Sequence, residues 1–189
     1  PAVGTGGMLS IATEQIKKIN PDVTIEGYGQ ELNPQSFAIC KSDMLIKGLN
    51  ADNIKYNELS GSLGKNDGFP NDKFHYMLSN PPYGVDWGKY AEEIKAEADK
   101  GSSGKYDAGL PRKSDGSLLF VMQMISKMKS VDEGGSRIGI VLNASPLFTG
   151  EAGSGENNIR KWIIENDWLE AIIALPDNLF YNTPIYTYI

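Results

Sequence analysis

The chain has 189 residues, of which 40% are hydrophobic, and it carries a formal net charge of −6. This composition fits one single-core globular domain and excludes an intrinsically disordered chain, while the acidic balance argues against strong independent binding to DNA or RNA. The single Cys40 excludes an internal disulfide and a thiolate zinc site and fits a reducing cytosol, and no stretch approaches the roughly 18 apolar residues of a membrane span.

The first 80 residues are predicted to alternate between helices and strands. The chain opens on a glycine-rich turn, residues 4–7, which leads straight into residues with apolar side chains at helical spacing. A strand normally precedes such a turn, and because Pro1 is the first residue we expect this chain to lack that strand. In chain order we expect a helix to about residue 19, a strand at 23–28, a helix at 33–49, a strand at 53–56, a loop at 60–72 and a strand at 74–79.

A long polar segment, residues 84–114, opens the second half of the chain. Its first part has helical composition and its second part is rich in Gly and Ser, so we expect it to be mobile. The alternation of strands and helices predicts an α/β fold with a mostly parallel sheet. The later predicted elements are an apolar helix at 116–130 that begins near Ser114 or Asp115, a strand at 137–143, a helix at 156–167, and strands at 169–176 and 184–189.

The glycine-rich turn and Glu31 together point to a nucleotide-like ligand. Glycines allow the backbone to turn tightly and to approach a ligand, and the N-terminus of a helix offers free N–H groups. Glu31 lies just past the next predicted strand, about two dozen residues after the turn, where an acid can accept both hydroxyls of a ribose. The alternatives are a plain glycine turn and a bare surface carboxylate, but the two features support one another.

The stretch Asn80-Pro81-Pro82-Tyr83 follows the predicted strand at 74–79. Pro82 restricts Pro81 to extended geometry, which holds the Pro81 carbonyl in one direction. The Asn80 side chain supplies a second carbonyl, so two oxygens can accept hydrogen bonds from one exocyclic NH2 group. Tyr83 adds a flat face on which a planar ring can stack. We interpret the stretch as a clamp for an amino-bearing planar group, in preference to a strand that merely ends at prolines.

In this order the motifs resemble the catalytic core of an N6-adenine DNA methyltransferase, specifically the modification (M) subunit of a type I restriction-modification system. NPPY alone is shared with glutamine and other amino-group methyltransferases, whereas SPLFTG and LPDNLFYNT narrow the resemblance to the type I group. It covers nearly all 189 residues in colinear order. The stretches that carry it are PAVGTGGML, GQELN, SNPPYG, SDGSLLF, RIGIVLNASPLFTG and IRKWIIENDWLEAIIALPDNLFYNTPI.

The resemblance implies a Rossmann-like S-adenosylmethionine-dependent methyltransferase fold, a mostly parallel twisted sheet flanked by helices. The first strand, an N-terminal helical region and C-terminal helices would be absent from this chain. The donor would be S-adenosylmethionine, held by its methionine and ribose end at the glycine turn, by its ribose at Glu31 and by its adenine against Leu32. The implied catalytic residues are Asn80, Pro81, Pro82, Tyr83 and Phe180, and the implied donor-binding residues are Ala2, Gly4, Thr5, Gly6, Glu31 and Leu32.

In the same way the resemblance implies the partners. The substrate would be duplex DNA with its target adenine flipped out of the stack, since N6 cannot be reached inside a duplex. A specificity (S) subunit would read the DNA sequence and a second M subunit would join it, with a restriction (R) subunit as an optional further partner and no membrane. Because a separate subunit reads DNA, the acidic charge of this chain is no obstacle.

Four departures from the family pattern stand out. The family has an acid immediately before the position of Pro1, and the acid after its third strand has no clear equivalent here, Glu58 being the nearest. Gly is common where Pro184 stands and Asp where His75 stands, and we expect this only histidine to be structural. The alternatives are another NPPY enzyme that methylates a protein glutamine or an RNA base amine, and a non-catalytic assembly fragment.

Overall fold

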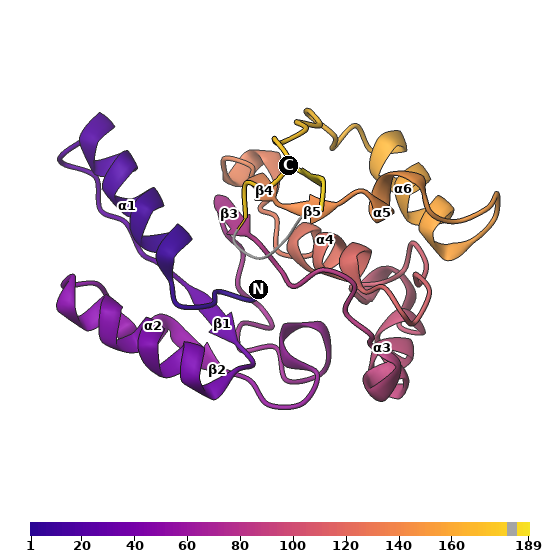
Figure 1. Cartoon of the computed structure of the whole chain (residues 1–189), viewed down its shortest axis with the longest axis horizontal. Coiled ribbons are helices and arrows are strands. Elements are labelled where there is room, and N and C mark those ends of the chain that lie inside the picture. The colour runs from indigo at the N-terminus through magenta and orange to yellow at the C-terminus, as the bar shows by residue number, and fades with distance from the viewer. Residues whose placement is uncertain (181–184) are drawn as a thin grey trace. The chain divides into compact units, whose positions relative to one another are not determined.

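The structure is a computed structural model, and it describes residues 1–180 and 185–189 (Figure 1). These residues divide into two compact units, Pro1–Asp72 and Lys73–Ile189. Each unit contains helices and a pair of parallel strands, which is the predicted α/β class. Among the described residues, no helix combines the length and the apolar character that a membrane crossing requires.

In the first unit, two helices accompany two short parallel strands. Gly29 lies opposite Ile54 in the strand register, and α2 lies alongside both strands (Figure 1). The Asn33 side chain caps α2 by accepting hydrogen bonds from the next two free N–H groups, and Pro34 occupies the first turn, as predicted. The elements are α1 (Gly7–Ile19), β1 (Gly29–Glu31), α2 (Pro34–Ile46), η1 (Ala51–Asn53), β2 (Ile54–Tyr56) and η2 (Gly61–Leu63).

The core of the first unit is small and lies between α2 and β2. Half-buried apolar side chains pack against its buried residues from the N-terminal segment, from α1, from α2 and from the turn after α2. Gly29 is required here because a Cβ at this position would lie 2.8 Å from Val3 Cγ2. The absence of that Cβ lets the N-terminal turn lie directly against β1, where the Val3 N–H donates to the Gln30 carbonyl at 3.0 Å. The cluster comprises Cys40, Met44, Ala51 and Ile54, with Val3, Leu9, Phe37 and Leu49 packed against it.

The strand predicted at residues 23–28 is wrong, because the strand is Gly29–Glu31 instead. A strand is defined by hydrogen bonds to a neighbour rather than by its own apolar residues. Gly29–Glu31 has such neighbours in Ile54–Tyr56 and Val3. Within the described residues, 23–28 pairs with no other segment.

A polar link couples the two helices of this unit. The Ser10 hydroxyl of α1 donates to Asp43 Oδ2 of α2 at 3.0 Å, and Lys47 Nζ lies 2.9 Å from the same oxygen. The hydrogen bonds from Lys47 and then Ser10 hold the pKa of Asp43 below its ordinary value. The ionised carboxylate is therefore the form that the fold stabilises.

We expect Asp43→Asn to lower the free energy of unfolding near neutral pH, and this loss to shrink as the pH falls. The folded pKa of Asp43 lies below its unfolded pKa. Its contribution is therefore present above the unfolded pKa and is lost as the pH falls through the folded value. Urea unfolding of the wild type and of Asp43→Asn at pH 7 and at about pH 3 measures their difference in unfolding free energy. A difference of the same size at both pH values would contradict a stabilising role of the ionised Asp43 carboxylate.

The second unit contains two parallel strands, one short antiparallel pair and an apolar helix. Tyr76 pairs with Arg137 and Ser79 with Ile140, and β5 runs antiparallel to β6. Helix α4, beside β4 (Figure 1), is almost entirely buried, as its apolar sequence predicted. The elements are β3 (Tyr76–Ser79), η3 (Gly88–Tyr90), α3 (Ala91–Ala98), η4 (Gly101–Ser103), α4 (Ser117–Ile125), η5 (Val131–Glu133), β4 (Arg137–Ile140), β5 (Leu142–Asn143), α5 (Ser145–Phe148), α6 (Gly155–Glu165) and β6 (Thr187–Tyr188).

The strand predicted at 137–143 is divided into β4 and β5, which pair with different partners. The last hydrogen bond beside β3 runs from the Val141 N–H to the Ser79 carbonyl at 2.9 Å. Beyond it, Pro81 and Pro82 have no N–H to extend the ladder. The chain after Val141 therefore pairs with β6 instead.

The strand predicted at 169–176 is wrong in extent, since the described residues form only an isolated antiparallel bridge between Ala174 and Tyr188. The strand predicted at 184–189 is confirmed only for Thr187–Tyr188, and its first residue, Pro184, lies outside the described residues. In the polar segment 84–114, α3 confirms the helical part. The mobility of that segment stays a prediction, and its Trp87, Ile94 and Tyr106 side chains are buried.

Candidate active site

Glu31 is bonded directly to the glycine-rich turn. The Gly4 N–H donates to Glu31 Oε2 at 2.7 Å, and Glu31 Oε1 accepts from the backbone N–H groups of Leu32 (2.9 Å) and Asn33 (2.8 Å). The turn and the acid were predicted as separate parts of one ligand site, and the first unit brings them together at the end of β1. A carboxylate has about four lone-pair sites, so the three N–H donors found among the described residues leave one open.

The two left-handed glycines of the turn have different surroundings. Gly4 has a φ of +60° and no atom of the described residues lies within 4 Å of an added Cβ, whereas Gly6 has a φ of +85° and its Cβ would meet Cys40 Sγ at 2.8 Å. Ala2 also has a positive φ, of +50°, and Thr5 is exposed. Gly4 therefore borders open space that a ligand can enter, while Gly6 lets the turn pack on α2.

Two residues with different surroundings follow β2, Asn57 and Glu58, the acid nearest to the family position. Glu58 has an exposed side chain. Asn57, the residue directly after β2, is buried and its amide donates to Gln30 Oε1 at 2.5 Å and to the Asn66 carbonyl at 2.8 Å. Leu32 is 46% exposed, which leaves its side chain available to pack on a planar group.

The clamp residues lie directly after β3 in the second unit. The Tyr83 hydroxyl donates to Asn80 Oδ1 at 2.9 Å. Burial raises the pKa of Tyr83 above its ordinary value, so this hydroxyl remains a donor at neutral pH. An amide oxygen has two lone pairs, and the Tyr83 hydroxyl leaves one of them for a further donor.

Pro81 completes the pair of acceptors. Its side chain is buried, and Pro82 restricts its backbone to extended geometry. Among the residues that the structure describes, none donates a hydrogen bond to its carbonyl. The Asn80 amide and the Pro81 carbonyl thus each have acceptor capacity left, which matches the two hydrogens of an exocyclic amine.

Phe180, His75 and Cys40 differ in their exposure. Phe180 is half-buried, and its predicted contact with the substrate base stays a prediction. His75 is exposed and precedes β3, at the opposite end of the strand from Asn80. Cys40 is fully buried, and burial raises the pKa of its thiol, which disfavours the thiolate that a nucleophile requires.

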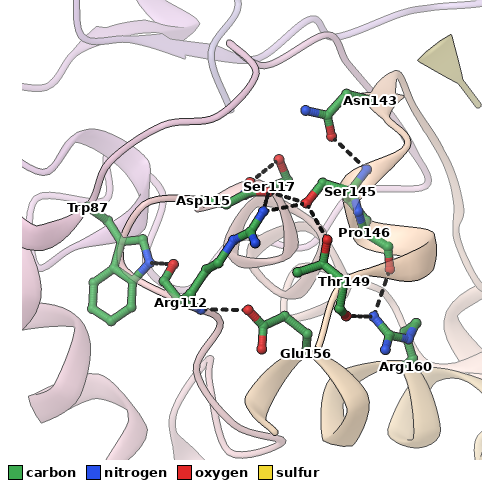
Figure 2. Close-up of polar contacts among 10 residues, drawn as sticks. All are labelled: Trp87, Arg112, Asp115, Ser117, Asn143, Ser145, Pro146, Thr149, Glu156 and Arg160. Carbon is green, nitrogen blue, oxygen red and sulfur yellow. Dashed lines mark hydrogen bonds and ion pairs between the residues drawn. The ribbon is translucent and has the colours of Figure 1, made fainter. Parts of the chain in front are cut away.

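Sequence reasoning missed a polar cluster in the second unit, which we name the Asp115 hub. Figure 2 shows its five residues, Arg112, Asp115, Ser117, Ser145 and Thr149, converging from separate segments. Asp115 Oδ1 accepts from the Ser117 N–H (3.1 Å) and hydroxyl (2.7 Å), and Asp115 Oδ2 accepts from the Ser145 hydroxyl. The sequence offered two partial signals, because Asp115 was a predicted helix start and Ser145 opens the SPLFTG stretch.

Asp115 is only 8% exposed. Burial alone would raise the pKa of this carboxyl, but hydrogen bonds from Ser145 and Ser117, together with the nearby Arg112 charge, hold it below its ordinary value. Arg112 Nη2 lies 3.5 Å from Asp115 Oδ2. The hub is therefore built around a buried, ionised carboxylate whose hydrogen-bonding capacity is largely used.

Comparison with solved structures defines the class of this fold. The type I restriction-modification methyltransferase subunit from Streptococcus thermophilus is 25% identical with a TM-score of 0.77, covering 99% of this chain and 37% of that one. The EcoKI M protein is 22% identical with a TM-score of 0.69, covering 100% and 37%. The fold is thus the Rossmann-like fold of S-adenosylmethionine-dependent methyltransferases.

Within that class, the whole of residues 1–189 matches the model of the N-6 DNA methylases, and the chain belongs to this family. The MjaVII type I restriction enzyme methylase subunit of Methanocaldococcus jannaschii is 32% identical over 184 residues. That match covers 96% of this chain and 30% of the relative, so the chain spans about a third of the length of such proteins. The resemblance inferred from the motifs is confirmed.

Proposed function

We propose that this chain is the catalytic core of a type I modification subunit, which transfers a methyl group from S-adenosylmethionine to N6 of adenine in duplex DNA. The observation that carries the proposal is the pair of acceptors after β3, Asn80 Oδ1 and the Pro81 carbonyl, in a chain that belongs to the N-6 DNA methylase family. The names of the relatives, type I methylase subunits, support the assignment to that system.

The clamp suits the chemistry of an amine nucleophile. Bound S-adenosylmethionine supplies a methyl group on a positively charged sulfur. The adenine N6 would take this methyl group as its bond to sulfur breaks, so positive charge would develop on N6 until a proton leaves to solvent. Two oxygen acceptors aimed at N6 strengthen as this charge grows, which lowers the barrier. No covalent enzyme intermediate is needed.

The ring of Tyr83 would stack on one face of the flipped adenine, and Phe180 would pack against the base from another side. The hydroxyl of Tyr83 has a separate role, because its hydrogen bond to Asn80 Oδ1 holds the Asn80 amide carbonyl in a fixed direction. A fixed acceptor needs no reorganisation when the base arrives. The direction of the Asn80 carbonyl is thus fixed by the same residue that would stack on the adenine ring.

In the donor site, Ala2, Gly4, Thr5 and Gly6 would border the methionine and ribose end, with Leu32 against the adenine. Glu31 would accept the ribose hydroxyls. The described residues leave only one of its lone-pair sites open. A second ribose hydroxyl would therefore have to replace the Gly4 N–H at Glu31 Oε2 or share that oxygen with it. Donor binding would therefore directly change a hydrogen bond that holds the glycine-rich turn.

The partners follow from the same proposal. The DNA would be bound mainly through other parts of the assembly, because this chain has a net charge of −6. A specificity subunit and a second modification subunit would supply the remaining contacts and the sequence readout, and a restriction subunit would join them in the cutting form. We place this assembly in the cytoplasm, with no membrane partner.

The proposal is tested with the full-length protein and its specificity subunit. Tritium from labelled S-adenosylmethionine should enter unmethylated duplex DNA and be recovered as N6-methyladenine. A release-factor protein and an adenine-containing RNA, offered in parallel, should remain unlabelled. Labelled protein or RNA in place of DNA would favour the other NPPY enzymes, and donor binding without any transfer would favour an assembly role.

Replacing Glu31 with alanine should weaken donor binding by about tenfold or more, while the rate of transfer at saturating donor changes less. The loss removes an acceptor for ribose and also the partner of the Gly4 N–H. Calorimetric titration with S-adenosylmethionine measures the dissociation constant. Glu26→Ala, at an exposed acid of the first unit that lies outside the glycine-rich turn, is the control, and an unchanged constant in the Glu31 variant would remove the ribose role.

A further inference from the structure

The segment that follows the clamp is bonded to a second strip of chain. The Trp87 N–H donates to the Lys113 carbonyl and its indole Nε1–H to the Arg112 carbonyl, both at 2.9 Å. The Gly116 N–H donates to the Val85 carbonyl at 2.8 Å. Trp87 is buried with 2% exposure and lies only four residues after Tyr83. The backbone just beyond the clamp is therefore fixed by residues 112–116.

That strip is in turn fixed by the Asp115 hub and by α6. The Arg112 N–H donates to Glu156 Oε1 at 2.8 Å, and its guanidinium donates to the Ser145 hydroxyl at 3.1 Å. Figure 2 shows this path from the Trp87 indole through Arg112 to Ser145. Each link is a hydrogen bond between described atoms, so the path from the SPLFTG turn to the clamp segment is continuous.

The proton positions in the hub follow from the ionised state of Asp115. A carboxylate can only accept, so the single hydroxyl proton of Ser145 points to Asp115. The contact of 3.1 Å between the hydroxyls of Ser145 and Thr149 must then be donated by Thr149. Ser145 thus makes one donated and two accepted hydrogen bonds, which uses its full capacity.

The SPLFTG turn is held on its other side as well. Arg160 Nη1 donates to the carbonyls of Pro146 (3.1 Å) and Thr149 (2.6 Å), and Asn143 Oδ1 accepts from the Ser145 N–H at 3.2 Å. β3 and β4 are parallel neighbours, so the chain leaves both strands at the same edge of the pair. The clamp and the SPLFTG turn lie after those two strand ends, and the hub joins the segments that follow them.

We propose that the Asp115 hub is a positioning device for the amine clamp, with Ser145 as its central residue, acting through Arg112 and Trp87 on the chain directly after Tyr83. The hub residues would not touch the adenine. They would hold the Asn80 and Pro81 oxygens in the arrangement that favours the transition state, so that loss of the hub lowers kcat rather than donor or DNA affinity. This inference rests on the proposed function of the clamp.

The test compares Ser145→Ala, Ser145→Thr and Ser130→Ala in the full-length protein with its specificity subunit. Ser130 is the matched control, because its hydroxyl also bonds a carboxylate, Glu133 Oε2 at 2.9 Å, in the same unit but outside the hub. We expect Ser145→Ala to lower kcat for DNA methylation by about tenfold with unchanged KM for donor and DNA. Ser145→Thr, which keeps the hydroxyl, should recover most of the lost kcat.

Hydrogen exchange supplies a readout that does not depend on activity. In Ser145→Ala, the amides of Trp87 and Gly116 should exchange faster than in the wild type, and in Ser130→Ala they should not. Equal kcat and equal exchange in the two alanine variants would overturn the positioning role. If the wild type methylates no DNA, the proposed function fails, while the exchange result still decides whether the hub fixes the clamp segment.

Discussion

Replacing Asn80 with alanine is expected to reduce methyl transfer by at least about a hundredfold while S-adenosylmethionine binds as before. The substitution removes one of the two acceptors for N6, and a hydrogen bond to a developing charge is worth about 1.5–3 kcal/mol. It also removes the partner of the Tyr83 hydroxyl, which frees the ring that would stack on the base. Both losses act on the transition state, so kcat falls.

Single-turnover methylation of unmethylated duplex DNA measures this effect, and donor titration checks that the first unit is intact. Tyr83→Phe separates the two losses, since it keeps the ring and removes only the hydroxyl, and we expect it to lose much less activity. Asn71→Ala, at an exposed asparagine before β3, is the matched control. Near-normal turnover in the Asn80 variant would eliminate the clamp assignment.

Gly6→Ala should destabilise the first unit by about 2–4 kcal/mol. An alanine at a φ of +85° is strained, and its Cβ would lie 2.8 Å from Cys40 Sγ and 3.0 Å from Met44 Cε. Both sulfur-bearing side chains are buried and belong to the core between α2 and β2, so neither can move aside at low cost. The turn would therefore shift away from α2 and carry Gly4 with it.

Hydrogen exchange of the α1 and α2 amides in the full-length protein measures the local free energy of opening. Gly7→Ala is the control, because no atom lies within 4 Å of its added Cβ and the residue begins α1, so stability should stay level or rise slightly. Gly4→Ala adds strain without overlap, since its φ is +60° in open space. A Gly6 variant no less stable than the Gly4 variant would disprove the packing argument.

The helices could be predicted well because their signals are local. The apolar spacing of α1, the Asn33 cap with Pro34 in α2, and the apolar run of α4 each lie within one short window. Strand limits could not be predicted as well, because a strand exists only where another segment offers hydrogen bonds. Thus the pairing of Gly29–Glu31 and the division after Val141 depend on partners tens of residues away.

The candidate site shows the same contrast. Gly4 and Glu31 were predicted as parts of one site from their spacing, and their hydrogen bond confirms that they lie together. The hydrogen bond between Tyr83 and Asn80 lies within one four-residue stretch, but no sequence pattern indicated it. The Asp115 hub joins residues 30 positions apart through polar side chains without periodicity, so only the folded chain reveals it.

If the donor binds at the glycine-rich turn as proposed, the contact between Gly4 and Glu31 has a thermodynamic consequence. The glycine-rich turn is already held in place by this hydrogen bond, so little conformational entropy would be lost when a nucleoside binds. A hydroxyl that displaces the amide exchanges one hydrogen bond for another, which makes the enthalpy of that step small. Association should consequently be rapid, and its strength should come chiefly from the surfaces that the nucleoside covers.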